Sequence, residues 1–171
     1  MPNSMRTRLP ALALLILGLA GAAQARVTQI TITKTAPAFK GQSFGNVGPY
    51  EVIRGTATGE IDPGDRRSKV ITDIQFAPRN ASGKVVYTTT FTILKPADMS
   101  KANGILVYDV TNRGNPRFAS RFTRFVLASG PGDPDFADAG DGSLYKAGYV
   151  VAMSGWQGDV SVNAAGADRQ G

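Results

Sequence analysis

The sequence contains neither cysteine nor histidine. Without thiols the chain has no disulfide and no thiol nucleophile, and without either residue type it has no cysteine or histidine zinc site. A complete Ser-His-Asp triad is excluded because the histidine is missing. Any reaction of these classes therefore needs residues that this sequence does not supply.

Charged residues are also scarce. Asp, Glu, Lys and Arg make up 19% of the 171 residues, whereas hydrophobic residues make up 42%. This balance is typical of a globular chain, and the length suits one domain or one domain with part of another. The 20 glycines and 10 prolines exceed average usage and favour a strand-rich body with many turns.

Residues 1–25 have the pattern of a signal peptide. Arg6 and Arg8 precede an apolar run, and Ala23 and Ala25 are small residues at the two positions that a signal peptidase reads. The run is shorter than the roughly 20 residues needed to cross a bilayer. We therefore expect cleavage, a periplasmic or secreted product and no stable membrane anchor afterwards. Loss of the two arginines lowers the formal charge from +6 to +4, which argues against a nucleic-acid partner.

Residues 26–96 are predicted to form a β-rich antiparallel region. Hydrophobic and polar residues alternate around residues 30–32 and again over residues 70–76, as in half-buried strands. Residues 84–94 are rich in branched and aromatic side chains, which suit a pleated surface. Clusters of Gly, Asn, Asp and Pro separate these stretches and predict the turns of hairpins.

Residues 97–171 are predicted to begin a parallel sheet. Two short apolar runs, residues 105–110 and 149–153, have the composition of strands that are covered on both faces. A helical pattern lies between them, and the order strand, helix, strand implies parallel strands with helices on the faces. The expected fold class is therefore α/β, in which the antiparallel amino-terminal half leads into the first parallel strands of a sheet.

The helical pattern between these two runs has two parts. Pro116 suits the first position of a helix, and Phe118, Phe122 and Phe125 then fall on one stripe, which we expect to pack on the sheet. A second, brief helical turn is predicted near Leu144, ending before a glycine that closes it.

The segment Asn112-Arg113-Gly114 is a candidate ligand-binding loop. It follows the first parallel strand and precedes a helix, which is where α/β sheets bind ligands through free backbone N–H groups. Gly114 allows a close approach of the backbone. The competing interpretation is that Asn and Gly are turn and cap residues and that Arg113 is solvated.

Ser154 and Trp156 follow the second parallel strand and are candidates for the wall of a pocket. Trp156 equally suits an anchor that holds the loop on the core, because large aromatic side chains mostly supply buried area. Ser154 lacks the preceding glycine of a nucleophile elbow, so we do not expect it to be a nucleophile.

Four aspartates, at positions 133, 135, 138 and 141, invite a calcium interpretation, but their spacing does not fit a calcium loop. Neither a metal nor another cofactor is expected, and a solvated loop is favoured.

Several stretches together resemble the amino-terminal part of a family of exported bacterial α/β-hydrolase-domain proteins. They are SFGNVGPYE (43–51), DIQFAPRN (73–80), FTILKPAD (91–98), YDVTNRGN (108–115) and GYVVAMSGWQGD (148–159). The resemblance implies that residues 105–110 and 149–153 correspond to the third and fourth strands of that fold. It also implies that Asn112-Arg113-Gly114 supplies a backbone N–H to an oxyanion hole.

The resemblance implies a chain without catalytic residues of its own. In such enzymes the nucleophilic serine, the acid and the histidine come later in chain order, so we expect a truncated sheet that leaves residues 105–110 as an exposed apolar edge. The expected function is that of the front portion of an exported serine hydrolase for a small acyl substrate, inactive alone. The alternative is a non-catalytic, exported, β-rich binding module.

Overall fold

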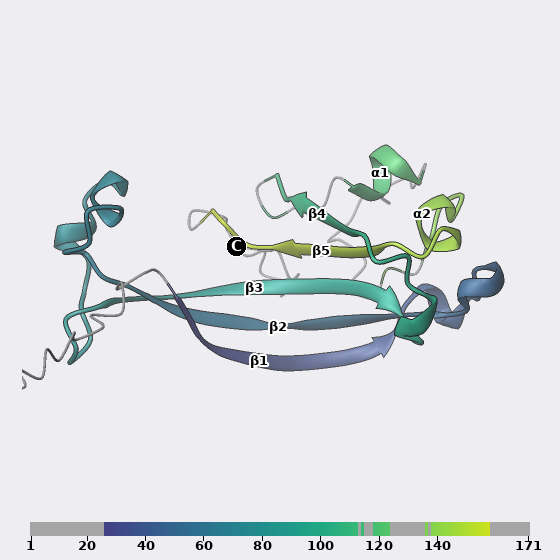
Figure 1. The fold of residues 1–171 in the computed structure, drawn as a ribbon, viewed down its shortest axis with the longest axis horizontal. Coiled ribbons are helices and arrows are strands. Elements are labelled where there is room, and N and C mark those ends of the chain that lie inside the picture. Colours follow the sequence, from purple (N-terminus) through teal and green to yellow (C-terminus); the bar gives the residue numbers. More distant parts are fainter. Residues whose placement is uncertain (1–25, 113, 115–117, 124–135, 137, 158–171) are drawn as a thin grey trace, which may run out of the picture.

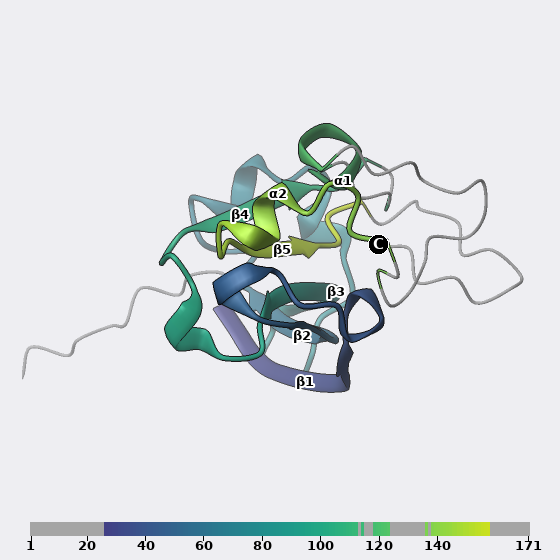
Figure 2. The ribbon, with the colours of Figure 1, turned by 90° about the vertical axis from the view of Figure 1, so that its right-hand side faces the viewer.

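The described part of the chain forms one five-stranded mixed β-sheet (Figure 1). The computed structural model describes residues 26–112, 114, 118–123, 136 and 138–157; the predicted signal peptide lies outside these residues. The strands are β1 (Arg26–Pro37), β2 (Tyr50–Ile61), β3 (Val85–Pro96), β4 (Leu106–Val110) and β5 (Val150–Ser154). Their order in the sheet is β1-β2-β3-β5-β4, which Figure 2 shows from the end of the strands.

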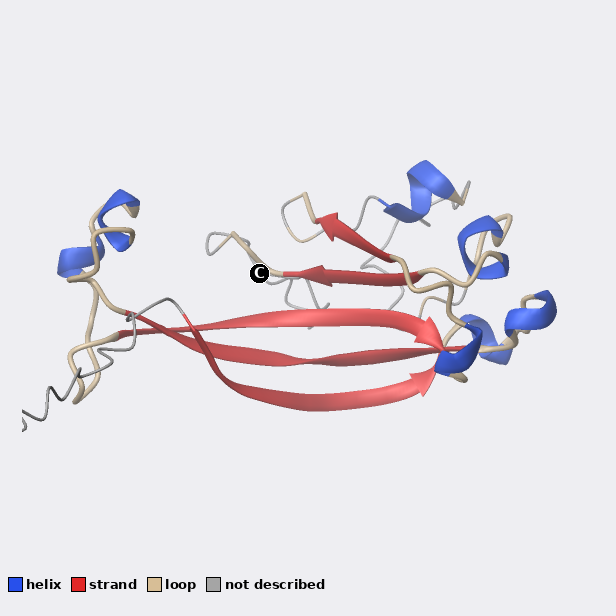
Figure 3. Cartoon of the chain, in the orientation of Figure 1, coloured by secondary structure: helices blue, strands red, loops and turns tan. Residues whose placement is uncertain are grey.

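The expected α/β fold class is wrong. Neighbouring strands are antiparallel throughout the sheet except for β4 and β5, which are parallel. The two described α-helices, α1 (Phe118–Phe122) and α2 (Ser143–Lys146), have 5 and 4 residues, so neither is long enough to cover a sheet face (Figure 3). The fold is β-rich because β3 pairs directly with β5, which joins the antiparallel strands and the parallel pair in one sheet.

The helical expectations are met in part. The turn predicted near Leu144 is α2, and Gly148 follows it with a φ of 77°. In α1, Phe118 is 2% exposed whereas Phe122 is 60% exposed, so the two rings do not share a buried stripe. The helix ends after little more than one turn, which leaves Phe122 at its rim. Phe125 lies outside the described residues.

Five short 3-10 helices complete the described secondary structure: η1 (Phe39–Gly41), η2 (Gly45–Val47), η3 (Ser68–Val70), η4 (Ile74–Phe76) and η5 (Met99–Lys101). The strand predicted over residues 70–76 is therefore wrong, because this stretch forms parts of two helical turns. Asp73, between them, has a left-handed backbone with a φ of 60°, which breaks any extended conformation.

Glycines in β2 make room for aromatic rings of β3. Gly55 pairs with Phe91 and Gly59 pairs with Tyr87. A Cβ atom at Gly55 would lie 2.6 Å from Cζ of Phe91, and one at Gly59 would lie 2.3 Å from Cζ of Tyr87. Each ring therefore lies over a position where a side chain is absent, and glycine is required there for packing.

Four aromatic rings form the centre of the core. Phe39, Phe44, Tyr50 and Tyr145 are all at most 2% exposed, and the centroids of Phe39 and Tyr145 are only 4.4 Å apart. The hydroxyl of Tyr50 donates to the carbonyl oxygens of Tyr145 and Tyr149, at 3.2 and 2.9 Å. Burial raises the pKa of Tyr50 to about 12. Burial is also the largest cause of the raised pKa of Tyr145, to which Tyr50 and the negative charge of Asp138 add.

The two faces of the sheet differ in burial. On the core face, the cross-strand row of Val52, Leu94 and Val151 is fully buried against the aromatic cluster. On the other face, the neighbouring row continues from Ile93 to Ala152 and Tyr108, and these side chains are partly or largely exposed. We call this second side the open face. Within the described residues, no helix is both long enough and apolar enough to span a membrane.

Candidate functional site at the carboxyl edge of the parallel pair

The carboxyl ends of β4 and β5 lie side by side. The register of the parallel pair places Val110 opposite Ser154, so both strands end at the same edge of the sheet. The segments that leave this edge contain the residues singled out from the sequence. The end of a parallel pair is a general location for ligand binding, because backbone N–H groups of the outgoing segments are not used by the ladder.

A hydrogen bond joins these two outgoing segments. The indole Nε1 of Trp156 donates to the carbonyl oxygen of Thr111 at 2.6 Å. The side chain of Trp156 is nevertheless 60% exposed. The ring therefore does not anchor its loop on the core. It lies at the surface beside the start of the Asn112-Arg113-Gly114 segment, where the sequence predicted a pocket wall.

The position of Trp156 is fixed from the side of β3 as well. The residue before it, Gly155, donates its N–H to the carbonyl oxygen of Thr90 at 3.0 Å. The carbonyl oxygen of Gly155 accepts from the hydroxyl of Thr89 at 2.7 Å. Bonds to β3 and to Thr111, the residue after β4, thus hold the segment after β5, which restricts the orientations that the indole can take.

Ser154 forms a second contact across the parallel pair. Its Oγ lies 2.5 Å from the hydroxyl oxygen of Tyr108, and either oxygen can donate. The register places Ser154 opposite Val110 and Phe91, so this hydroxyl pair lies on the open face. With no histidine in the sequence, no imidazole base can activate either oxygen.

The core side of the same edge holds two buried polar residues. Asp109 is buried, and its Oδ2 accepts a hydrogen bond from the N–H of Phe118 at 3.2 Å, which fixes the start of α1 against the end of β4. Thr111 is completely buried, and its Oγ1 has no hydrogen-bond partner among the described residues. An unsatisfied buried hydroxyl is unfavourable by about 1–3 kcal/mol, so this oxygen is a notable feature of the edge.

The basic residue Arg54 is also buried on the core face, in the same cross-strand row as the acidic residue Asp109. The register links Arg54, Thr92, Met153 and Asp109 across four strands. The Cζ atom of Arg54 lies 5.9 Å from the centroid of the Phe136 ring, within the range of a cation–π contact. Arg54 and Asp109 are both 8% exposed, so the core face below the candidate site carries one buried positive and one buried negative side chain.

The structure places the predicted loop residues unequally. Asn112 is exposed, whereas Gly114 is buried and has a φ of 75°, a left-handed conformation that favours glycine. Arg113 lies outside the described residues. The sequence interpretation missed Tyr108 and Thr111. The available signal was the alternation of apolar and polar residues at the end of this strand, where Tyr108 and Val110 alternate with Asp109 and Thr111. The sequence interpretation instead assigned the run to a strand that is covered on both faces.

The described residues of this edge suit binding. Tyr108 and Ser154 place a pair of hydroxyl groups there and Trp156 adds an exposed indole ring, and groups of these kinds can contact a ligand. Within the described part of the chain, no three His, Cys, Asp or Glu side chains are grouped so as to hold a metal ion. Of the four aspartates noted in the sequence, Asp133 and Asp135 lie outside the described residues.

Comparison of the chain with protein-family models, with curated proteins and with solved structures found no match.

Proposed function

We propose that this chain forms the amino-terminal part of an exported serine hydrolase that cleaves an ester or a related acyl bond. In this proposal the segment after β4 binds the carbonyl oxygen of the substrate, and the segment after β5 forms the adjoining wall. The proposal rests on the family resemblance together with one observation, the hydrogen bond from Trp156 to the carbonyl oxygen of Thr111. That bond holds the candidate oxyanion loop and the candidate pocket wall together at one edge.

The chemistry of acyl transfer explains why such an edge is useful. When a serine oxygen adds to the substrate carbonyl, the carbonyl oxygen takes up negative charge, and fixed backbone N–H groups stabilise that charge. The sequence has no histidine, so in this proposal the proton of the serine goes to a histidine that lies outside these 171 residues. The chain alone is therefore expected to bind and orient without turnover.

The exposed edge of β4 supports the same proposal. Leu106, Tyr108 and Val110 are all exposed on a strand that has a described partner on one side only, β5. Apolar residues on an open strand edge favour pairing with another strand, and soluble proteins usually protect such edges. In this proposal a further strand of the hydrolase covers that edge and brings the nucleophile next to the Asn112-Arg113-Gly114 segment.

A non-catalytic, exported binding module is the second candidate. The observation that favours it is the exposure of two aromatic side chains, Trp156 and Tyr108, at one end of a largely antiparallel sheet. Exposed aromatic rings with nearby hydroxyl groups suit a carbohydrate or a cell-envelope ligand. This candidate needs neither a further strand nor a catalytic base.

The coding sequence after the Gly171 codon and an ester assay separate the two candidates. The hydrolase proposal expects a continuing frame that encodes Gly-x-Ser-x-Gly and a later histidine, and a longer product that cleaves a chromogenic acyl ester. The 171-residue chain itself should give no turnover above buffer. A stop codon at this point, together with cooperative melting of the short product, would support the binding module.

A variant of the longer product tests the role of the edge. Trp156→Phe removes the N–H donor and keeps an aromatic ring, so kcat should fall about tenfold while KM changes little. Met99→Leu, in η5 outside the carboxyl edge, is the matched control and should leave both constants unchanged. An unchanged kcat in Trp156→Phe would argue against a positioning role for the bond.

A further inference from the structure

The segment between β2 and β3, residues 62–84, extends the sheet at one end. It contains η3 and η4, and it stands at the left of Figure 1, beyond the ends of β4 and β5. We call it the 62–84 connector. It lies beyond the carboxyl ends of β4 and β5, but the contacts described at the candidate site, Tyr108 with Ser154 and Trp156 with Thr111, include none of its residues, so a role for the connector is independent of the proposed hydrolase function.

The connector exposes large apolar side chains. Val70 is 85% exposed and Phe76 is 79% exposed, and Ile71 is also exposed. Ser68 and Ile74, in the same two helical turns, are buried. The turns therefore have an inner side that holds Ser68 and Ile74, and the three exposed apolar side chains lie outside it. Exposed Val, Ile and Phe grouped in seven consecutive positions are typical of a contact surface.

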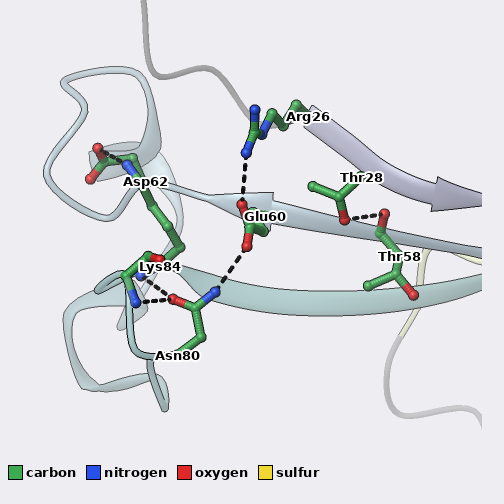
Figure 4. A network of polar contacts seen from close by, with 8 residues as sticks. Arg26, Thr28, Thr58, Glu60, Asp62, Asn80 and Lys84 are labelled. Carbon is green, nitrogen blue, oxygen red and sulfur yellow. Dashed lines mark hydrogen bonds and ion pairs between the residues drawn. The ribbon is translucent and has the colours of Figure 1, made fainter.

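The base of the connector is held by polar contacts (Figure 4). Nζ of Lys84 lies 2.5 Å from Oδ2 of Asp62, and this hydrogen bond is the main reason that the pKa of Asp62 lies below its ordinary value. Nδ2 of Asn80 donates to Oε1 of Glu60 at 2.9 Å, and Oε2 of Glu60 accepts from Arg26 at 3.3 Å. These contacts join the two ends of the connector to each other and to β2, and Glu60 in turn links β2 to β1.

The charge of the connector is positive. It contains five basic and three acidic side chains. Asp62 is engaged by Lys84, and Asp65 accepts a hydrogen bond from the N–H of Arg67 at 2.8 Å. The third acid, Asp73, is exposed between Val70 and Phe76. Arg66 and Lys69 precede the exposed apolar positions, are themselves exposed, and form no ion pair with any described residue. Their charge is available to a partner.

We propose that the 62–84 connector docks on an anionic lipid bilayer, with Val70, Ile71 and Phe76 entering the interfacial region and Arg66 and Lys69 contacting lipid phosphates. Apolar side chains next to basic ones are the combination that interfacial binding to anionic lipids requires. A protein partner fits less well, since three side chains on one narrow connector do not offer the about 800 Å² per partner of a stable protein interface. A bilayer needs no such complementary surface.

Vesicle binding tests the proposal. The chain from Arg26 onward retains every described residue and omits the apolar run of the predicted signal peptide, so that this run does not contribute to the lipid binding that is measured. Far-UV circular dichroism and a cooperative melt establish the fold of each protein. Co-sedimentation is then measured with phosphatidylcholine vesicles with and without phosphatidylglycerol. Binding should be strong only with the anionic vesicles and should weaken as salt is raised.

Variants identify the residues responsible. Phe76→Asp should lower the partition coefficient by about tenfold or more, since burial of one aromatic side chain is worth at least that factor. Arg66→Gln and Lys69→Gln should each lower it by about fivefold on anionic vesicles. The matched controls are Met99→Asp and Lys101→Gln in η5, an exposed apolar and an exposed basic residue at the opposite end of the sheet in Figure 1.

Two results would overturn the proposal. The first is equal partition of the unchanged chain onto anionic and neutral vesicles, or no partition onto either, which leaves a protein partner or a second copy of the chain as the occupant. The second is an equal loss of binding in the η5 controls. If Phe76→Asp fails to fold, Arg66→Gln and Lys69→Gln test the proposal, because they alter only exposed side chains. Unchanged binding of both variants to anionic vesicles would then contradict it.

Discussion

The indole Nε1 of Trp156 lies 2.6 Å from the carbonyl oxygen of Thr111, and this bond connects the segments that follow the two parallel strands. The ring itself is mostly exposed. Trp156 therefore contributes to the structure mainly through one hydrogen bond and only secondarily through burial, which makes its effect on stability predictable.

Trp156→Phe should destabilise the fold by about 1 kcal/mol, the net value of one hydrogen bond. Urea unfolding followed by far-UV circular dichroism measures it, because the only tryptophan is removed and fluorescence is lost as a probe. A loss above about 3 kcal/mol is the size expected for a buried aromatic anchor and would contradict the exposed position.

Thr111→Val should leave stability unchanged or raise it by up to about 1 kcal/mol. The Oγ1 atom is buried without a hydrogen-bond partner among the described residues, and an apolar group of the same shape removes that cost. Thr92→Val is the matched control, since Thr92 is equally buried but does have a polar partner, and it should cost about 1 kcal/mol. Thermal melts of both variants give the comparison, and a clear loss in Thr111→Val would show that its hydroxyl is used.

Stability should fall at alkaline pH because of Tyr50. Its pKa is about 12 in the folded chain and about 10 when exposed. Above pH 10 the unfolded chain releases a proton that the folded chain keeps, so the free energy of unfolding decreases as the pH rises from about 10 to 12. Below pH 10 the group contributes no pH dependence. Urea titrations at pH 8, 10 and 11 measure the effect.

Tyr50→Phe is the control for this pH dependence. The variant loses the bonds to the carbonyl oxygens of Tyr145 and Tyr149, so it should be less stable at pH 8 by about 1–3 kcal/mol. Its stability should nevertheless fall less steeply above pH 10, with the remainder due to Tyr145, whose pKa is also raised. An alkaline slope identical to that of the unchanged chain would assign the effect to other groups.

Gly148→Ala should be among the most harmful single substitutions. A Cβ atom there would lie 2.9 Å from the carbonyl oxygen of Lys101, and φ is 77°. Gly83→Ala separates the two causes, because Gly83 has a φ of 73° but no atom within 4 Å of the added Cβ. We expect about 1 kcal/mol for Gly83→Ala, from backbone strain alone, and at least 1 kcal/mol more for Gly148→Ala. Equal losses in chemical denaturation would mean that the contact with Lys101 relaxes freely.

The sequence predicted β3, β4 and β5 because their composition is strand-like over the whole element. It did not single out β2, because Gly55 and Gly59 weaken the strand pattern of that stretch. The same two glycines are needed in the structure, since the rings of their partners in β3 occupy the space of a side chain there. The assignment of residues 70–76 to a strand failed for a different reason. Alternation predicts an extended chain only where a sheet is available, and here the residues lie beyond its end.

The α/β prediction failed at the connection between β4 and β5. The spacing of Phe118 and Phe122 is correct for a helix face, but among the described residues the helix that contains them, α1, has only five residues. On its other side from β4, β5 pairs with the antiparallel strand β3. Of the candidate site, the positions of Trp156 and Ser154 at the strand ends followed from chain order. Their partners, Thr111 and Tyr108, depend on register, which apolar composition alone does not determine.

The glycine and aromatic pairs of β2 and β3 have a consequence for folding. The two strands are separated by the 62–84 connector, so no tight turn dictates how they align. A slip of one residue would drive the rings of Phe91 and Tyr87 against side chains instead of bare backbone. These two pairs thus restrict β2 and β3 to a single alignment, and through β3 that alignment also determines where β5 pairs.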